Sequence, residues 1–219
     1  MGHVVEFPVR LPEAEVFAHA DMARLYAAWR QAARARGLPR LRDFAPRLLG
    51  RWMAWSGIAE TDAGTVEALY DGAVFRWRLA GSALCRLAGE ELTRQVAFAD
   101  WQQFERATLT RLLGQAVFRG QAFVARLKLN GGDISDAGVE LVILPMRDTA
   151  RGRDVALLVF RPDFPPESLM PSRLAEARLM SLRTLLGVDA AGQTALATPA
   201  MSAAVAKILP LRDTHPAGA

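Results

Sequence analysis

The stretch VFRWRLAGSALCRLAGEELT, residues 74–93, is the part of the chain that decides the fold. Phe75, Trp77 and Leu79 alternate with arginines and a small residue, which predicts a strand with one apolar face. A Gly-Ser pair then breaks this period, and the next apolar residues recur at helical spacing. A half-buried strand that runs into short helices, with more strands later in the chain, predicts an α+β domain built on one sheet.

Further helices and strands are expected on both sides of this stretch. A helix is predicted to begin at Asp21 and to end at Gly37, and two later helices are predicted at 82–88 and 100–113. The predicted strands cover residues 65–70, 74–79, 115–129, 139–146 and 153–161. Because the links between them are short, with a turn pair at Asp71-Gly72, we expect neighbouring strands to be antiparallel.

The chain is expected to divide into four parts. Residues 1–20 form an extended lead-in, and residues 21–162 form the domain, including its N-terminal helices. Residues 163–187 hold a C-terminal helix, because apolar residues from Ala175 to Leu186 form a stripe at helical spacing. Residues 188–219 are rich in Ala, Thr, Gly and Pro and are expected to be a mobile tail.

The composition limits the kind of protein. Of 219 residues, 51% are hydrophobic and 23% are charged, which is typical of a globular domain. No apolar run approaches the ~18 residues of a membrane span, and the N-terminus lacks a signal-peptide pattern, so we expect a cytoplasmic protein. The net charge is +4, but the arginines are scattered among acidic residues, which argues against nucleic-acid binding.

Three segments in the same order resemble a known family. They are LYAAWRQAARARGLPRLRDFAP at residues 25–46, FRWRLAGSALCRLAGEEL at 75–92 and VELVILPMRD at 139–148. Together they are similar to a bacterial PAS-like family common in alphaproteobacteria, over about residues 21–162. Arg94 stands where that family often has Gly, and Ser82 replaces a more usual Thr.

The resemblance implies a five-stranded antiparallel PAS-like sheet with short helices on one face, plus flanking N- and C-terminal helices. It also implies a non-enzymatic sensory or protein-interaction domain in bacterial signal transduction. Because no output segment fits in the remaining residues, we expect the signal to pass to a separate partner protein.

The apolar inner face of the sheet is a candidate ligand site. PAS-like relatives often leave a cavity there for a small apolar ligand, whereas a filled core is the other interpretation of the same pattern. The cavity candidates are Trp77, Leu79, Phe123, Leu127, Leu141, Ile143, Leu158 and Phe160.

A second candidate site is a dimer interface on the first helix. Met22, Leu25, Tyr26 and Trp29 form an apolar stripe on a helix that is expected to lie outside the domain core. Since an exposed stripe of this size usually marks an interface, we expect a homodimer.

The residue types give no support for a metal site or for catalysis. His3, His19 and His215 lie near the ends of the chain, and none has a second ligand at helical spacing. Cys85, the single cysteine, lies between two leucines and is expected to be a small core residue. We therefore expect no metal and no cofactor, with an enzyme of unknown class as an alternative.

A nucleotide site is a further alternative. Asp133, Ser135 and Gly138 fit the D-x-S-x-x-G pattern of PilZ domains, which bind cyclic-di-GMP. Arg36 and Arg40 fit the R-x-x-x-R partner motif, although almost a hundred residues separate the two motifs. This alternative requires the arginines to lie beside the Asp-Ser turn.

Overall fold

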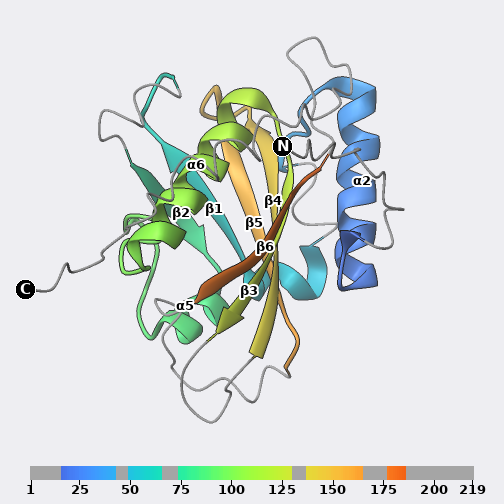
Figure 1. Ribbon diagram of the computed structural model, residues 1–219. Helices are drawn as coiled ribbons and strands as arrows, with labels where there is room; N and C mark the ends of the chain where they lie inside the picture. The colour runs from blue at the N-terminus through green and yellow to red at the C-terminus, as the bar shows by residue number, and fades with distance from the viewer. Residues whose placement is uncertain (1–15, 43–48, 66–73, 130–136, 165–176, 186–219) are drawn as a thin grey trace, which may run out of the picture.

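The computed structural model describes residues 16–42, 49–65, 74–129, 137–164 and 177–185. Its helices are α2 (Ala20–Arg36), α5 (Ser82–Ala88), α6 (Gln103–Arg119) and the 3-10 helix η1 (Gly50–Trp55). Its strands are β1 (Ser56–Thr61), β2 (Phe75–Ala80), β3 (Phe123–Leu129), β4 (Ala137–Asp148), β5 (Arg153–Pro162) and β6 (Arg178–Thr184). Within the described residues, the strands form one antiparallel sheet in the order β2-β1-β5-β4-β3-β6 (Figure 1). The expected α+β class is confirmed.

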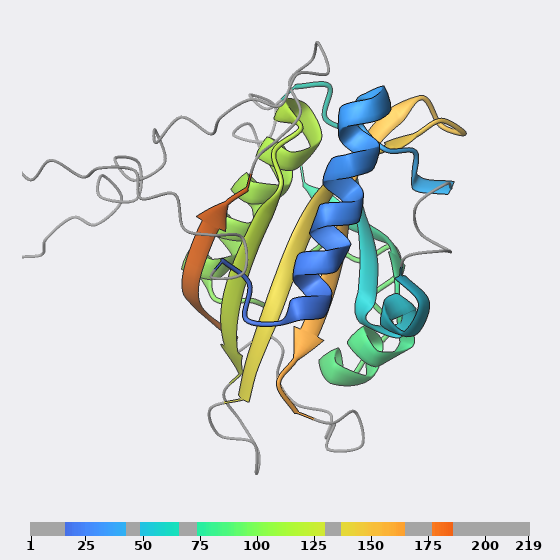
Figure 2. The same cartoon turned by 90° about the vertical axis from the view of Figure 1, so that its right-hand side faces the viewer.

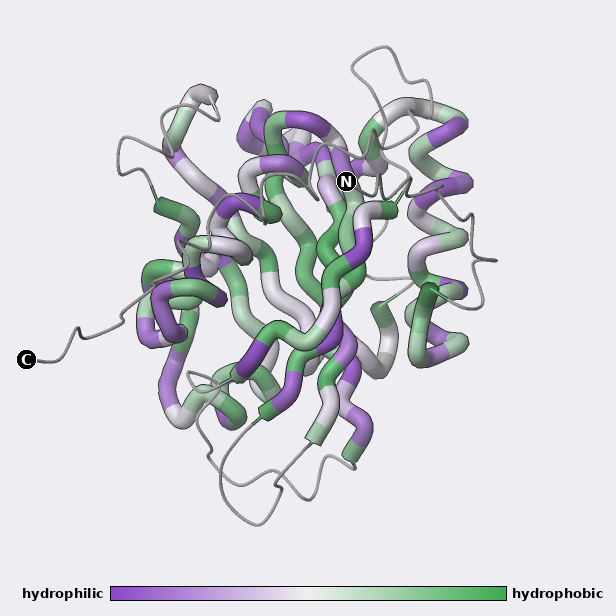
Figure 3. The backbone as a smooth tube through the Cα atoms, viewed as in Figure 1, coloured by the Kyte–Doolittle hydropathy of each residue, from purple (hydrophilic) through white to green (hydrophobic). Residues whose placement is uncertain are grey.

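Helices cover both faces of this sheet. In Figure 2, α2 lies against one face while α5 and α6 lie on the other side. The central strands β4 and β5 are therefore apolar on both faces, which is why the tube is green along the middle of the sheet in Figure 3. Alternation sorts their side chains between two cores: Leu141 and Ile143 face α6, whereas Val142 and Leu144 face α2.

The inner core lies between the sheet and α6. Leu109, Leu112, Leu113 and Ala116 recur along one stripe of α6, and none of them has exposed surface. The helix ends at Gly120, whose φ of 64° is a left-handed conformation that glycine adopts without strain. The predicted helix at 100–113 is confirmed in position but runs six residues further, so β3 begins only at Phe123.

The outer core lies between the sheet and α2. Met22, Leu25, Tyr26 and Trp29 are at most 5% exposed, because they pack on the outward-facing residues of β4 and β5. The prediction that this stripe is exposed and forms a dimer interface is therefore wrong. The apolar residues recur at helical spacing as predicted, but this face of the helix covers the domain's own sheet.

Trp29 fixes the position of α2 along the sheet. Its indole N–H donates a 2.9 Å hydrogen bond to the carbonyl of Pro145 in β4. Proline is tolerated at this point of a central strand because β3 pairs with β4 only as far as Ile143, so that Pro145 has β5 as its strand neighbour.

The predicted C-terminal helix is also wrong, because residues 178–184 form strand β6 at the edge of the sheet. Arg126 of β3 pairs with Ser181, and the next residue, Leu127, pairs with Leu179, so that Met180 has no partner in β3. This irregularity is a β-bulge. The bulge brings Leu179 and Leu182 onto the inner core although they are three residues apart. A spacing of three residues is typical of a helix, which explains the wrong prediction. With β6, the sheet has six described strands instead of the expected five.

Other predictions have mixed outcomes. The strands predicted at 74–79, 139–146 and 153–161 and the helix at 82–88 are confirmed with small changes of bounds. The strand before β2 is β1, which lies earlier than the predicted 65–70. Residues 66–70, the Asp71-Gly72 turn and the tail at 188–219 lie outside the described residues, as does most of the lead-in at 1–20.

We expect Trp29→Ala to lower the free energy of unfolding by about 3–5 kcal/mol, since it removes a fully buried ring. Trp29→Phe keeps most of the ring but not the indole N–H, and should cost less, about 1–3 kcal/mol. Urea unfolding of both variants measures the difference. A loss below about 1 kcal/mol for Trp29→Ala would mean that α2 does not pack on the sheet in solution.

Candidate functional site

Most of the predicted cavity residues are buried in the inner core. Seven of the eight are at most 2% exposed and belong to one hydrophobic cluster with side chains of α5 and α6: Trp77, Phe123, Leu127, Leu141, Ile143, Leu158 and Phe160. Leu79 differs, with 46% of its surface exposed. The β1–β2 register shifts so that Trp77 pairs with Ala59 and Leu79 with Ile58, which interrupts the alternation at Arg78 and places Leu79 on the other face.

A small hollow adjoins this core beside Trp77. It has a volume of about 60 Å³ and is bordered by Phe98 and Trp101, which meet each other edge to face at 5.0 Å. Such a volume holds only a few water molecules, whereas small-molecule sites commonly measure about 300–1,000 Å³. The inner face of the sheet therefore resembles a packed interior more than a ligand cavity.

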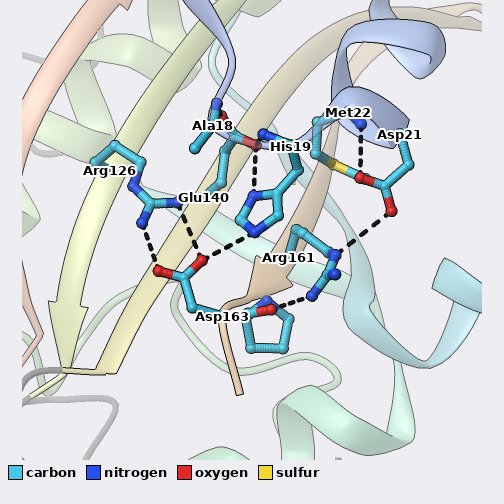
Figure 4. Close-up of polar contacts among 9 residues, drawn as sticks. Ala18, His19, Asp21, Met22, Arg126, Glu140, Arg161 and Asp163 are labelled. Atoms are coloured by element: carbon cyan, nitrogen blue, oxygen red, sulfur yellow. Dashed lines mark hydrogen bonds and ion pairs between the residues drawn. The ribbon is translucent and has the colours of Figure 1, made fainter. Parts of the chain in front are cut away.

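The most unusual polar group in the domain is Glu140, in the middle of the apolar strand β4. Its side chain has no exposed surface. Its carboxylate accepts hydrogen bonds from the backbone N–H groups of Ala18 at 2.6 Å and His19 at 3.1 Å, and it lies 3.0 Å from Nδ1 of His19 (Figure 4). A buried carboxylate is tolerated only with such partners, and here they come from the residues just before α2.

The polar contacts continue beyond His19. Nε2 of His19 lies 3.0 Å from Asp163 Oδ1, and Asp163 Oδ2 lies 2.6 Å from a guanidinium nitrogen of Arg126 (Figure 4). Arg126 is also the strand partner of Glu140 across β3 and β4. Glu140, His19, Asp163 and Arg126 thus form one connected group, which we call the latch cluster.

Gly138 leaves room for the latch cluster. A side chain at this position would collide with the Asp163 carboxylate and the Arg126 guanidinium. Gly138 therefore has a packing role in this cluster.

A second ion pair lies next to the latch cluster. Asp21, in the first turn of α2, lies 3.4 Å from the guanidinium of Arg161 in β5. The Arg161 guanidinium also lies over the ring of Trp52, 4.9 Å from its centre. The start of α2 is therefore held to β4 and β5 by polar side chains, and Asp163 links it to Arg126 of β3.

The far end of α2 is held at the opposite end of β4. The backbone N–H of Arg147 donates a 2.9 Å hydrogen bond to the carbonyl of Pro39, and Arg40 forms a parallel β-bridge with Arg147. The 17 residues of α2 span ~26 Å. The seven steps from Glu140 to Arg147 span ~24 Å of strand, so helix and strand are matched in length.

This geometry bears on the predicted nucleotide site. Arg40 lies beside Arg147, whereas Gly138 lies at the other end of the same strand, nine residues or ~30 Å away. Arg40 and Gly138 therefore do not lie at one site. The side chain of Arg36, and Asp133 and Ser135, lie outside the described residues.

Sequence reasoning missed the latch cluster because it took His19 for a surface residue near the chain end. One signal was present: Glu140 interrupts the apolar run of β4. A carboxylate inside a strand that is buried on both faces requires a partner, but nothing in the sequence indicates that the partner lies 121 residues upstream.

Cys85 lies on α5 at the edge of the inner core. Its Sγ is 3.9 Å from the carbonyl of Ala80 and 3.6 Å from a carboxylate oxygen of Glu91. Burial, together with the negative charge of Glu91, raises the pKa of the Cys85 thiol above its usual value. The thiol is therefore protonated at neutral pH and is a poor nucleophile.

Comparison with known proteins identifies the family. Residues 17–158, more than half of the chain, match the family model of the PAS domain. No curated protein and no solved structure matches the chain. The chain belongs to the PAS domain family, a class of sensory and interaction domains.

Among the residues that the structure describes, no helix has both the length and the apolar character needed to cross a membrane. In the same part of the chain, no group of three or more His, Cys, Asp or Glu side chains is arranged to hold a metal ion.

We expect Glu140→Ala to lower the free energy of unfolding by about 3–5 kcal/mol, because it removes a buried carboxylate that is the acceptor of two backbone N–H groups and lies beside the His19 ring. Glu140→Gln keeps one acceptor oxygen and should cost about 1–3 kcal/mol. Urea unfolding of each variant provides the measurement.

The matched control for this experiment is Asp62→Ala. Asp62 forms an ion pair with Arg153 at 2.9 Å, but its side chain is 93% exposed, so the change should cost less than about 1 kcal/mol. If Glu140→Ala were as mild as Asp62→Ala, the latch cluster would not hold α2.

We expect Cys85 to react slowly with iodoacetamide at pH 7 and faster as the pH rises, because only the thiolate reacts. Glu91→Gln removes a charge that raises the thiol pKa, so the rate at a given pH should increase. Glu90→Gln, a change at the next residue, is the control. Equal rates in wild type and Glu91→Gln at every pH would contradict the assigned contact.

Proposed function

We infer that this chain is a non-enzymatic PAS domain that acts in bacterial signal transduction through contacts with a separate partner protein in the cytoplasm. The observation that carries this inference is the contrast between the two faces of the sheet. The inner face is filled, whereas the outer face is covered by one helix whose start depends on a polar cluster.

The outer face supports an interaction role because α2 covers a large apolar surface. Val142, Leu144 and Leu157 of the central strands are buried beneath it. If α2 shifts, these side chains become exposed, and a partner that replaces the helix gains their burial. The latch cluster is the group whose contacts must break first at the start of α2.

The polar groups of the latch cluster support a role without catalysis. Both ring nitrogens of His19 lie 3.0 Å from a carboxylate oxygen, so neither is available to take a proton from a substrate. The four side chains of the cluster also include no hydroxyl or thiol nucleophile. Cys85, on the other face of the sheet, is held in its protonated form.

The alternative with a specific supporting observation is a small apolar ligand in the interior. The hollow beside Trp77 adjoins the interior, and an interior ligand would require this hollow to become larger. Homodimerisation also stays a prediction, but it must use a surface other than the stripe on α2, since that stripe is buried.

Native mass spectrometry of the purified chain tests the choice between the two. We expect the mass of the unmodified chain, or of a whole-number multiple of it, with no retained organic molecule. A stoichiometric bound molecule would overturn the inference and favour an interior ligand.

Affinity capture from cells tests the partner role, with wild type and Glu140→Gln as the two baits. At least one captured protein should differ in amount between the two baits. Identical capture would contradict a role for α2.

A further inference from the structure

A concavity lies where the segment after α2 approaches the β4–β5 hairpin, at the end of the sheet opposite the latch cluster. It has a volume of about 480 Å³. Its lining residues are Arg40, Leu41, Arg42, Arg78, Asp148, Thr149 and Ala150. The lining thus holds three arginines and one aspartate.

The Asp148 carboxylate already has partners within the protein. It is 5% exposed, one of its oxygens pairs with Arg78, and the other accepts a 3.0 Å hydrogen bond from the N–H of Ala150. Burial alone would raise the pKa of Asp148, but the hydrogen bonds from Arg78 and the backbone outweigh it and hold the pKa below its usual value. Asp148 therefore fixes Arg78 and stays ionised.

The other carboxylates that the structure describes at this end of the sheet are also paired. Glu60 lies 3.1 Å from Arg151, and Asp62 lies 2.9 Å from Arg153. Asp154 pairs with Arg147. Glu60 lies in β1, Asp62 directly after it and Asp154 in β5, and each already has an arginine partner.

Arg40 is different. Its side chain is exposed, and it makes no ion pair or hydrogen bond with any residue that the structure describes. Its backbone is nevertheless fixed, because the β-bridge to Arg147 and the buried neighbour Leu41 hold this segment against the sheet. A fixed backbone that carries an unused guanidinium toward a concavity is a preorganised anion-binding arrangement.

We propose that this concavity binds a small phosphorylated molecule. Guanidinium groups match phosphate oxygens in a fork of two parallel hydrogen bonds, and Arg40 lines the site. The exposed Thr149 adds a hydroxyl donor, and Leu41 and Ala150 add an apolar wall for the rest of the ligand. The volume lies within the range of small-molecule sites, and the proposal does not depend on the function inferred above.

Calorimetric titration of the full chain with inorganic pyrophosphate, at constant ionic strength, tests the proposal. We expect saturable binding by wild type and at least about a tenfold loss of affinity in Arg40→Ala, as expected when a charge-assisted hydrogen bond is lost. Arg40→Lys keeps the charge but not the fork, and should bind with intermediate affinity. Because the Arg40 side chain is exposed and has no ion pair among the described residues, these variants should fold like wild type.

Arg119→Ala is the matched control. Arg119 is an exposed arginine in the last turn of α6, on the other face of the sheet, so this change lowers the net charge equally without touching the concavity. Its affinity for pyrophosphate should equal that of wild type. The proposal is overturned if wild type does not bind pyrophosphate at millimolar concentration, or if Arg119→Ala weakens binding as much as Arg40→Ala.

Discussion

The burial of the Glu140 carboxylate is the constraint on which the rest of the structure depends. A carboxylate with no exposed surface in a central strand requires donors, and the described residues supply them from the segment that begins α2. The position of α2 follows from this pairing, and the outer core follows from α2. A polar requirement at one point of β4 thereby decides where a whole apolar layer lies.

The two faces of the sheet have different characters for a physical reason. The inner helices are joined to the sheet through the chain that links β2 to β3, and they bury their apolar stripes directly. Helix α2 instead precedes all six strands in the chain. The residues on either side of it contact Glu140 and Arg147 of β4. The outer layer is thus held by polar contacts near both ends of α2 and by the buried apolar stripe between them.

Periodicity in the sequence predicted those elements whose side chains alternate without interruption, such as β2 up to Trp77 and the central strand β5. Periodicity gave wrong predictions where a bulge changes the alternation of side chains. Leu79 was expected on the inner face, and the residues of β6 were expected to form a helix. It also failed for α2, because spacing identifies an apolar face but not what covers it. The latch cluster could not be predicted, since hydrogen bonds between residues as distant as His19 and Glu140 leave no periodic signal.

The equal lengths of α2 and of the strand beneath it have a consequence for how this chain can vary. One residue inserted into the helix would rotate everything after it by about 100°. Trp29 would then leave Pro145, and arginines on the solvent side would turn toward the apolar core. The phase of the helix is thus locked to the strand at three points, and changes of length are tolerable only in the connections outside them.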